Sequence, residues 1–209
     1  MLNTLFNFTV LWKLEISLTK TKCVTFTRGN KKEKHSFTLN NRPIENTIKY
    51  KYLGITIHKN GSFNPTRDDL ANRGTRAIFA LNKELNLKFI PIRTALMIFK
   101  ALVIPILTYG SEIWSPFLNQ DNDKWEQNPI EKVHSQYLKQ LLGVNRSTTN
   151  VMVKGDLGLH SLQAQVFQNH LNYMKYVHSK HNTLVTQAYI YERELSHTRI
   201  SFCETYKIL

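Results

Sequence analysis

The apolar residues of this chain change their spacing at one point, and that change limits the folds that the chain can adopt. Up to 57, short runs alternate with a period of two, most clearly in IKYKYLGITI at 48–57. The next residues, Lys59, Asn60 and Gly61, are a strong turn signal. Beyond them the apolar spacing becomes about 3.6 residues. The sequence therefore predicts an α+β fold, with short antiparallel hairpin strands first and an all-α helical bundle after them.

The stretch at 48–57 contains a second change of phase. Three residues of one phase share a side of the expected strand: Ile48, Tyr50 and Tyr52. Three of the other phase share the opposite side: Leu53, Ile55 and Ile57. Gly54 lies where the phase changes, and a glycine inside an apolar strand suggests a bulge or the close approach of another backbone. Lys49 and Lys51 alternate with the tyrosines, so this edge should suit a nucleic-acid backbone.

The residues before 48 predict further short elements. Cys23–Thr27 and Ser36–Asn40 are β-type runs, and the polar RGNKKEK between them indicates a hairpin connection. The apolar start, MLNTLFNFTVLW, predicts an initial helix. No basic region precedes it and no small-residue cleavage site follows it, so we expect an interior helix exposed by truncation and no signal peptide.

The first helix after the turn is expected from Asn64, as N-cap, to about Leu87, with Pro65 at its first position. Five apolar side chains fall on one arc of this helix: Leu70, Ala77, Ile78, Leu81 and Leu85. Three cations are expected on the opposite side: Arg73, Arg76 and Lys83. Such a face either holds phosphates or is only a solvated surface, and the pattern leaves both open.

Three more helices follow from local start and stop signals. Pro105 should kink or end the second helix, which covers the apolar run 96–107. The third is expected between a cap at Asn128 and a stop at Gly143, with Glu131 placed as in a capping box. Leu162–Val177 suggests the fourth. The expected domains are therefore a strand region at 1–61, a helical domain at 62–178 and a weakly patterned extension at 179–209.

The charge of the chain favours a polyanionic partner. Lys and Arg number 28 against 15 Asp and Glu, which gives a net charge of +13. The positive charge is spread along the chain rather than gathered on one amphipathic stretch, so nucleic acid fits better than a membrane. A basic chain that is simply well solvated is the alternative. Cys23 and Cys203 lie far apart without a secretory context, which indicates an intracellular location, nuclear or cytoplasmic, and no disulfide framework.

No catalytic or metal site is expected from the residue pattern. Asp68 and Asp69 are adjacent but are expected in the first turn of a helix, where the helix dipole explains them. Asp121 and Asp123 belong to a polar loop. No HExxH motif is present, and Ser111 in YGSEIW lacks the GxSxG frame. We therefore expect no metal ligands and no small-molecule substrate for this chain by itself.

Six segments occur in an order that is characteristic of one enzyme family: KTKCVTF, KYLGITI, RAIFAL, LMIFKALVIPILTYGSEIW, IEKVHSQYLKQLLGV and GDLGL. This series, over roughly residues 12–178, closely resembles the C-terminal part of the reverse transcriptases of non-LTR (LINE-type) retrotransposons. That part comprises the end of the palm and the thumb. The combination of KYLG with PILTYGSEIW is specific, although each piece alone is not.

The resemblance implies roles for particular residues. Lys20 would be a candidate proton donor to the pyrophosphate leaving group, although Ser17 stands where the family usually has asparagine. Tyr52, Leu53 and Gly54, with Lys49 and Lys51 beside them, would belong to a hairpin that resembles the primer grip, which holds the 3′ end of the growing strand. The basic face of Arg73, Arg76 and Lys83 would follow an RNA and DNA template–primer duplex by its backbone.

The catalytic aspartates of that family lie upstream of the KTK segment, and no such sequence precedes Lys20 here. The intact RNA-directed DNA polymerase uses those carboxylates to hold Mg²⁺, so we expect no cofactor in this chain and no polymerisation by it alone. The chain is expected to be a fragment of such an enzyme that binds nucleic acid. The alternative is a non-enzymatic, basic helical module for protein interaction.

Overall fold

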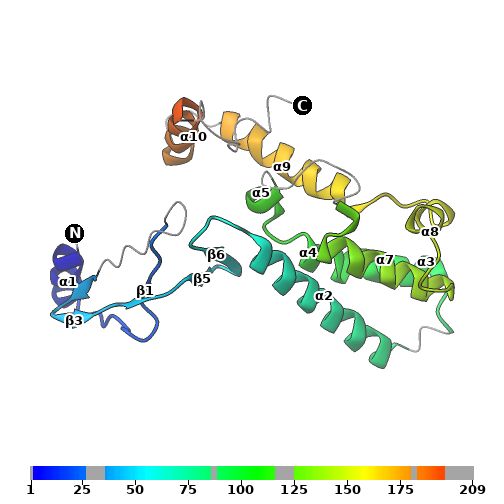
Figure 1. Cartoon of the computed structure of the whole chain (residues 1–209), viewed down its shortest axis with the longest axis horizontal. Helices are drawn as coiled ribbons and strands as arrows, with labels where there is room; N and C mark the ends of the chain where they lie inside the picture. Colours follow the sequence, from blue (N-terminus) through cyan, green and yellow to red (C-terminus); the bar gives the residue numbers. More distant parts are fainter. Residues whose placement is uncertain (1, 27–35, 86–88, 116–124, 180–182, 196–209) are drawn as a thin grey trace. The chain divides into compact units, whose positions relative to one another are not determined.

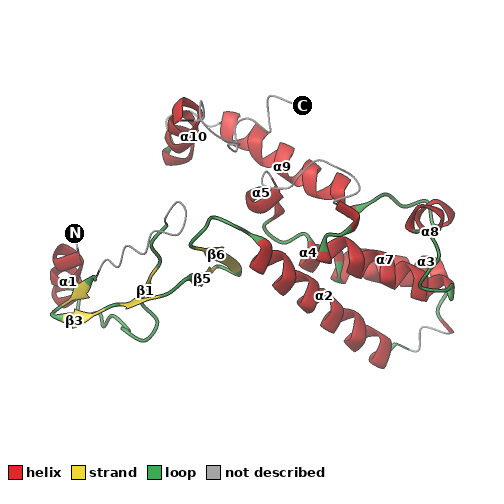
Figure 2. Cartoon of the chain, viewed as in Figure 1, coloured by secondary structure: helices red, strands yellow, loops and turns green. Residues whose placement is uncertain are grey.

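Among the residues that the structure describes, the strands lie in the first part of the chain and helices follow them (Figure 1, Figure 2). The computed structural model describes residues 2–26, 36–85, 89–115, 125–179 and 183–195. Two units are distinguished, residues 1–66 and residues 67–209. Short strands near the N-terminus followed by helices confirm the predicted α+β fold.

The described residues of the first unit form one helix and six short strands: α1 (Leu2–Leu11), β1 (Lys22–Cys23), β2 (Thr38–Leu39), β3 (Arg42–Pro43), β4 (Glu45–Asn46), β5 (Lys49–Tyr52) and β6 (Ile55–His58). They form three two-stranded sheets among the described residues. β1 pairs with β4 in parallel, whereas β2 with β3 and β5 with β6 are antiparallel. An ion pair between Lys22 and Glu45 links the side chains of β1 and β4.

The hairpin expected between Cys23–Thr27 and Ser36–Asn40 is wrong. β2 pairs instead with β3 through a two-residue turn at Asn40 and Asn41, whose φ angles are 47° and 56°. Asparagine adopts this left-handed conformation more readily than most residues, so the two asparagines allow the tighter hairpin. The RGNKKEK connection lies almost entirely outside the described residues.

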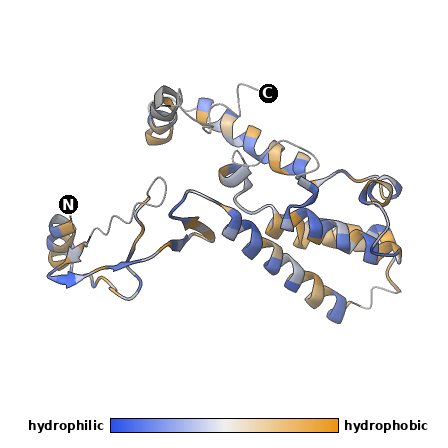
Figure 3. Cartoon of the chain, viewed as in Figure 1, coloured by the Kyte–Doolittle hydropathy of each residue, from blue (hydrophilic) through white to orange (hydrophobic). Residues whose placement is uncertain are grey.

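The predicted initial helix is present as α1, and much of it is hydrophobic (Figure 3). Its apolar side chains are largely exposed, among them Leu5, Phe8, Val10 and Leu11. Thr9 is buried and donates a hydrogen bond from Oγ1 to the carbonyl of Phe6, 2.8 Å away. Within the described helices of the chain, none combines the length and the apolar character needed to cross a bilayer.

Eight described helices follow: α2 (Asn64–Glu84), α3 (Ile92–Leu102), α4 (Ile104–Leu107), α5 (Ser111–Trp114), α7 (Pro129–Leu142), α8 (Asn150–Asp156), α9 (Leu162–Ser179) and α10 (Leu184–Leu195). The core of the second unit includes these buried apolar side chains of the helices: Leu70, Phe99, Leu107, Trp114, Ile130, Leu138, Val166 and Met174. Because these side chains come from six helices, burial joins the helices into one core.

Several sequence signals produce the predicted boundaries. Pro105 lies in the first turn of α4, directly after the break between α3 and α4 at Val103. The side chain of Asn128 accepts a hydrogen bond from the backbone N–H of Ile130, 3.1 Å away, and so caps α7. Gly143 ends α7 with φ at 66°, a conformation that favours glycine. Leu162–Val177 is helical as predicted, within α9.

The YGSEIW segment packs α5 onto α9. Gly110, at φ 65°, precedes α5, and Trp114 donates from Nε1 to the carbonyl of Tyr109, 2.9 Å away. Asn169 of α9 donates from Nδ2 to Oγ of Ser111 at 2.8 Å, and Ser111 is fully buried. The side chain of this serine therefore joins two helices.

Candidate nucleic-acid interface

The KYLG segment forms the tip of a regular antiparallel hairpin. Tyr52 pairs with Ile55, and two residues, Leu53 and Gly54, connect β5 to β6. Their φ angles of 45° and 85° are both positive, which is the signature of a type I′ turn. Of the two interpretations of Gly54, the bulge is wrong, because the change of phase in the sequence is the turn between two strands. The hairpin that the family resemblance implies at KYLG is present.

The hairpin has one aromatic and aliphatic face and one cationic and polar face. Directly paired residues of antiparallel strands project to the same side of a sheet. Tyr50 and Tyr52 therefore share a face with their partners, Ile57 and Ile55. The other face carries two lysines and their partners: Lys49, Lys51, His58 and Thr56. The isoleucines were expected on the side opposite the tyrosines, and the turn reverses that prediction.

Side chains of β5 and of the turn are open to solvent. All four residues of β5 are exposed, whereas Ile55 at the start of β6 is buried. Tyr52 is 59% exposed and Leu53 is 73% exposed. Leucine in a left-handed conformation costs roughly 1–2 kcal/mol relative to ordinary backbone angles. An exposed apolar residue held in such a conformation suggests a function for the tip rather than a contribution to stability.

Thr66 forms hydrogen bonds with the outer edge of β6, the strand that follows the turn. Its Oγ1 accepts a hydrogen bond from the backbone N–H of Thr56 and donates one to the carbonyl of the same residue, both at 2.9 Å. Thr66 is 1% exposed. The backbone groups of Thr56 at the edge of β6 are therefore paired within the protein. The side chains of β5 remain exposed to solvent.

Lys20 lies in a turn before β1 and is exposed. The turn closes on Ser17, whose carbonyl accepts hydrogen bonds from the backbone N–H groups of Lys20 and Thr21 at 3.2 and 3.0 Å.

Within the described ranges, no group of three or more His, Cys, Asp or Glu residues is placed so that it could hold a metal ion. Asp121 and Asp123 lie outside the described residues.

Asp68 and Asp69 lie beyond the first turn of α2. The prediction that the helix dipole explains this acidic pair is therefore wrong, because it required both residues in the first turn. Asp69 instead forms an ion pair with Arg73 one turn later, with 3.4 Å between Oδ2 and Nε. Arg73 is half-buried, and its guanidinium lies 5.9 Å from the centre of the Tyr109 ring. The three-cation face therefore divides: Arg76 and Lys83 are exposed, while Arg73 lies at the edge of the buried arc.

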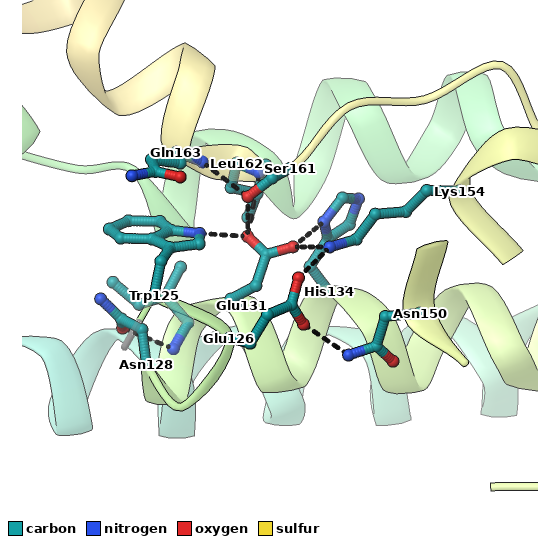
Figure 4. A network of polar contacts seen from close by, with 11 residues as sticks. Trp125, Glu126, Asn128, Glu131, His134, Asn150, Lys154, Ser161, Leu162 and Gln163 are labelled. Atoms are coloured by element: carbon teal, nitrogen blue, oxygen red, sulfur yellow. Dashed lines mark hydrogen bonds and ion pairs between the residues drawn. The ribbon is translucent and has the colours of Figure 1, made fainter. Parts of the chain in front are cut away.

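A buried carboxylate that sequence reasoning treated only as part of a cap organises the helical unit (Figure 4). Glu131 of α7 is 0% exposed. Its Oε2 accepts hydrogen bonds from Nε1 of Trp125 at 2.7 Å, from Oγ of Ser161 at 3.0 Å and from the backbone N–H of Leu162 at 2.9 Å. The capping box is therefore not formed, because this side chain caps the start of α9.

The other oxygen of Glu131 meets a lysine and a histidine. Oε1 lies 2.7 Å from Nζ of Lys154 in α8 and 3.4 Å from Nδ1 of His134. Lys154 also donates to Glu126, 2.9 Å away, and Asn150 donates from Nδ2 to the same carboxylate. One lysine therefore links two acidic side chains, and the network joins α7, α8 and the first turn of α9.

The environment of Glu131 favours its ionised form. Burial alone would raise the pKa of this carboxyl, but hydrogen bonds from His134, Lys154 and Trp125 outweigh burial and lower the pKa from 4.5 to about 2. Burial likewise opposes the charge of Lys154, yet its bonds to Glu126 and Glu131 leave the pKa of the lysine raised. Glu131 and Lys154 are therefore both charged and paired. Because their network lies between helices, it indicates a structural role.

No protein-family model matches the chain, and neither the curated proteins nor the solved structures include a match.

Proposed function

We propose that this chain binds RNA–DNA template–primer duplexes through their sugar–phosphate backbones, as the end of the palm and the thumb of a LINE-type reverse transcriptase would. The β5–β6 hairpin is the observation that supports this most. Its exposed tip, Leu53 and Gly54, carries an apolar side chain in a strained conformation. A leucine that stabilised the fold would be expected to bury its side chain, whereas Leu53 is exposed.

The two faces of the hairpin supply different kinds of contact. Tyr50 and Tyr52 offer ring surfaces that can pack on a terminal base or sugar without reading its sequence. Lys49 and Lys51 offer charges for phosphate oxygens on the other face. Gly54 has no side chain, so a strand end can approach the turn closely.

Two exposed cations of α2 supply a second contact of the same kind. Arg76 and Lys83 are seven residues apart, which places them on one helix face about 10 Å from each other along the axis. Both can neutralise backbone phosphates. Arg73 is excluded from this set because its guanidinium is engaged with Asp69 and Tyr109.

The proposal is tested by measuring the affinity for an RNA–DNA hybrid across a range of salt concentrations. We expect the logarithm of the association constant to fall linearly with the logarithm of salt, by about 0.7–0.9 for each phosphate contacted. The double variant Arg76→Ser, Lys83→Ser should bind more weakly and show a shallower slope, whereas Lys175→Ser, an exposed lysine of α9, should change neither appreciably. Affinity that is independent of salt would contradict the proposal.

One observation favours the alternative, a protein-interaction module. Val151 and Met152 of α8 are adjacent and are 79% and 65% exposed. Under that function the double variant of Arg76 and Lys83 would leave hybrid affinity unchanged, while Met152→Ser would weaken binding to a protein partner. The hybrid measurement therefore separates the two functions.

A further inference from the structure

A polar pocket of about 320 Å³ opens beside α7 and α8. Its lining includes Lys132, Ser135 and Lys139 from one face of α7, at spacings of three and four residues. Arg146 from the following loop and Asn150 from α8 also line the pocket. We propose that this α7–α8 pocket binds one ribonucleotide unit of an RNA strand, an inference that rests on the proposed nucleic-acid function.

The charge of the pocket suits a phosphate. Lys132, Lys139 and Arg146 contribute three positive charges, and Glu126 is the acidic residue among the described lining. The Glu126 carboxylate is already held by Lys154, 2.9 Å away, and by Asn150. Lys154 is shared with Glu131, so it offsets the negative charge of Glu126 only in part. Three cations against this one carboxylate still leave an excess of positive charge for an anionic ligand.

A buried hydroxyl in the pocket also lacks a partner. Ser135 is 5% exposed, and its Oγ makes no hydrogen bond with the described part of the chain. A buried polar group without a partner costs free energy, so such groups are rare unless a ligand or water satisfies them. A phosphate oxygen would accept a hydrogen bond from this hydroxyl while the cations hold its charge.

The amide of Asn150 gives the pocket a second kind of contact. Nδ2 donates to Glu126, which fixes the orientation of the amide, because the reverse orientation would set two oxygens against each other. Oδ1 is buried and has no donor among the described residues. A diester phosphate has no proton to donate, whereas a ribose 2′-hydroxyl does, so this acceptor favours RNA over DNA.

The size of the pocket limits the ligand to one unit of a strand. Sites for small ligands begin at about 300 Å³, which accommodates a group of nucleotide size and not a base pair with both strands. The pocket would therefore hold a single-stranded nucleotide, in addition to the duplex contacts proposed for the hairpin and for α2.

The test compares binding of the full chain to a single-stranded RNA and to a DNA of the same sequence, with three single variants. Wild type should bind the RNA more tightly. Lys132→Gln and Ser135→Ala should each lower RNA affinity several-fold, up to roughly tenfold for one charge-assisted bond. Ser135→Ala should not lower the melting temperature, because its hydroxyl bonds to no described group. Lys175→Gln removes an exposed charge elsewhere and should leave RNA affinity within about twofold.

Equal RNA affinity for wild type and both pocket variants would overturn the inference, as would equal binding of RNA and DNA. Inorganic phosphate as a competitor separates a free-phosphate site from a strand site, since displacement of RNA by millimolar phosphate alone would contradict a strand site. If Arg76→Ser, Lys83→Ser lowers hybrid affinity while the pocket variants bind RNA normally, the pocket inference fails and the proposed function stands. If the α2 double variant binds the hybrid normally while the pocket variants bind RNA more weakly, the proposed α2 contact fails and the pocket inference is supported.

Discussion

At the scale of single residues, Glu131 has the largest expected effect on stability. Its carboxylate is fully buried, and its oxygens contact groups from α7, from α8 and from the start of α9. Removing one partner of a buried ion pair leaves the other charge without compensation inside the protein, which costs more than the pair itself contributes. Of its two carboxylate partners, Lys154 would lose the fully buried one and keep Glu126, which is 2.9 Å away and 34% exposed.

We expect Glu131→Gln to lower the free energy of unfolding by about 3 kcal/mol. The amide keeps the shape of the carboxyl but cannot balance Lys154, and one of its two polar atoms can no longer accept hydrogen bonds. Urea denaturation measures the loss, with Glu84→Gln at the exposed end of α2 as the control. A loss no larger than that of the control would show that the network contributes little.

The same carboxylate predicts a pH dependence. Its pKa in the folded chain, about 2, lies below its ordinary value of 4.5, so its contribution to stability is complete above pH 4.5 and disappears as pH falls towards 2. The difference in unfolding free energy between wild type and Glu131→Gln should therefore be constant above about pH 5.5 and shrink below pH 4.5. A difference that stays constant down to pH 2.5 would be inconsistent with a lowered pKa.

Leu53 permits a test that separates stability from binding. Leu53→Asn places a residue that tolerates positive φ before Gly54 and produces the Asn-Gly turn that two-residue hairpins prefer. We expect an unchanged or slightly higher melting temperature together with weaker affinity for the RNA–DNA hybrid. If affinity stays at the wild-type value, the leucine side chain does not contact the strand.

Single residues differ in how far the sequence reveals them. Asn128 and Gly143 were predicted because a cap depends on neighbours within one turn. The network of Glu131 was not predicted, since Leu162 lies 31 positions away and such a pair leaves no periodic signal. Arg73 was misplaced because it lies between the buried and exposed arcs of α2, where periodicity alone does not determine a side.

At the scale of elements, length decided which helices could be predicted. α2, α3, α7 and α9 are long enough to show an apolar period, and the sequence predicted all four. α5 and α8 have four and seven residues and were missed. α10 was missed for another reason, because its mixed composition weakened the pattern beyond His178. The β5–β6 hairpin was expected from the family resemblance of KYLG, whereas the residue pattern by itself shows its short turn as an irregularity in one strand.

The contact between α2 and α4 depends on a missing side chain. A Cβ added at Gly74 would lie 2.4 Å from Cδ2 of Leu107, and Leu107 is fully buried. Gly74→Ala should therefore lower the free energy of unfolding by about 1–2 kcal/mol, even though alanine is the better helix former.

Gly155 of α8 offers the matched control, because nothing lies within 4 Å of an added Cβ there. Gly155→Ala should raise stability by about 0.5–1 kcal/mol through helix propensity. Thermal or urea unfolding of both variants decides the prediction. Similar changes in the two variants would mean that the helices can separate slightly without loss.

At the scale of the whole molecule, the change from period two to period 3.6 was sufficient to predict an α+β fold, because it depends on many residues at once. Strand pairing was not predictable to the same degree. β1 pairs with β4 across more than twenty residues, and two-residue strands carry too little pattern to specify a partner. The net charge of +13 led to the hypothesis of a polyanionic partner but predicts no surface for it.

A prediction about activity belongs to the whole chain. Residues 1–209 contain no aromatic-x-Asp-Asp sequence, the motif with which the reverse transcriptases named in the proposed function would hold Mg²⁺. Under the proposed function, we expect the chain to bind a primed RNA template but not to extend the primer in the presence of Mg²⁺ or Mn²⁺. Template-dependent incorporation of nucleotides by the purified chain would refute this expectation.

The two-residue connection between β5 and β6 has a consequence for how this segment can vary. Replacing a side chain in the hairpin alters one contact, but inserting or deleting one residue in β5 would exchange the two faces of that strand, so that lysines and tyrosines trade places. The segment should therefore accept changes of residue type more readily than changes of length. In a chain that drifts by mutation, the spacing from Lys49 to Gly54 would outlast the identities of the residues within it.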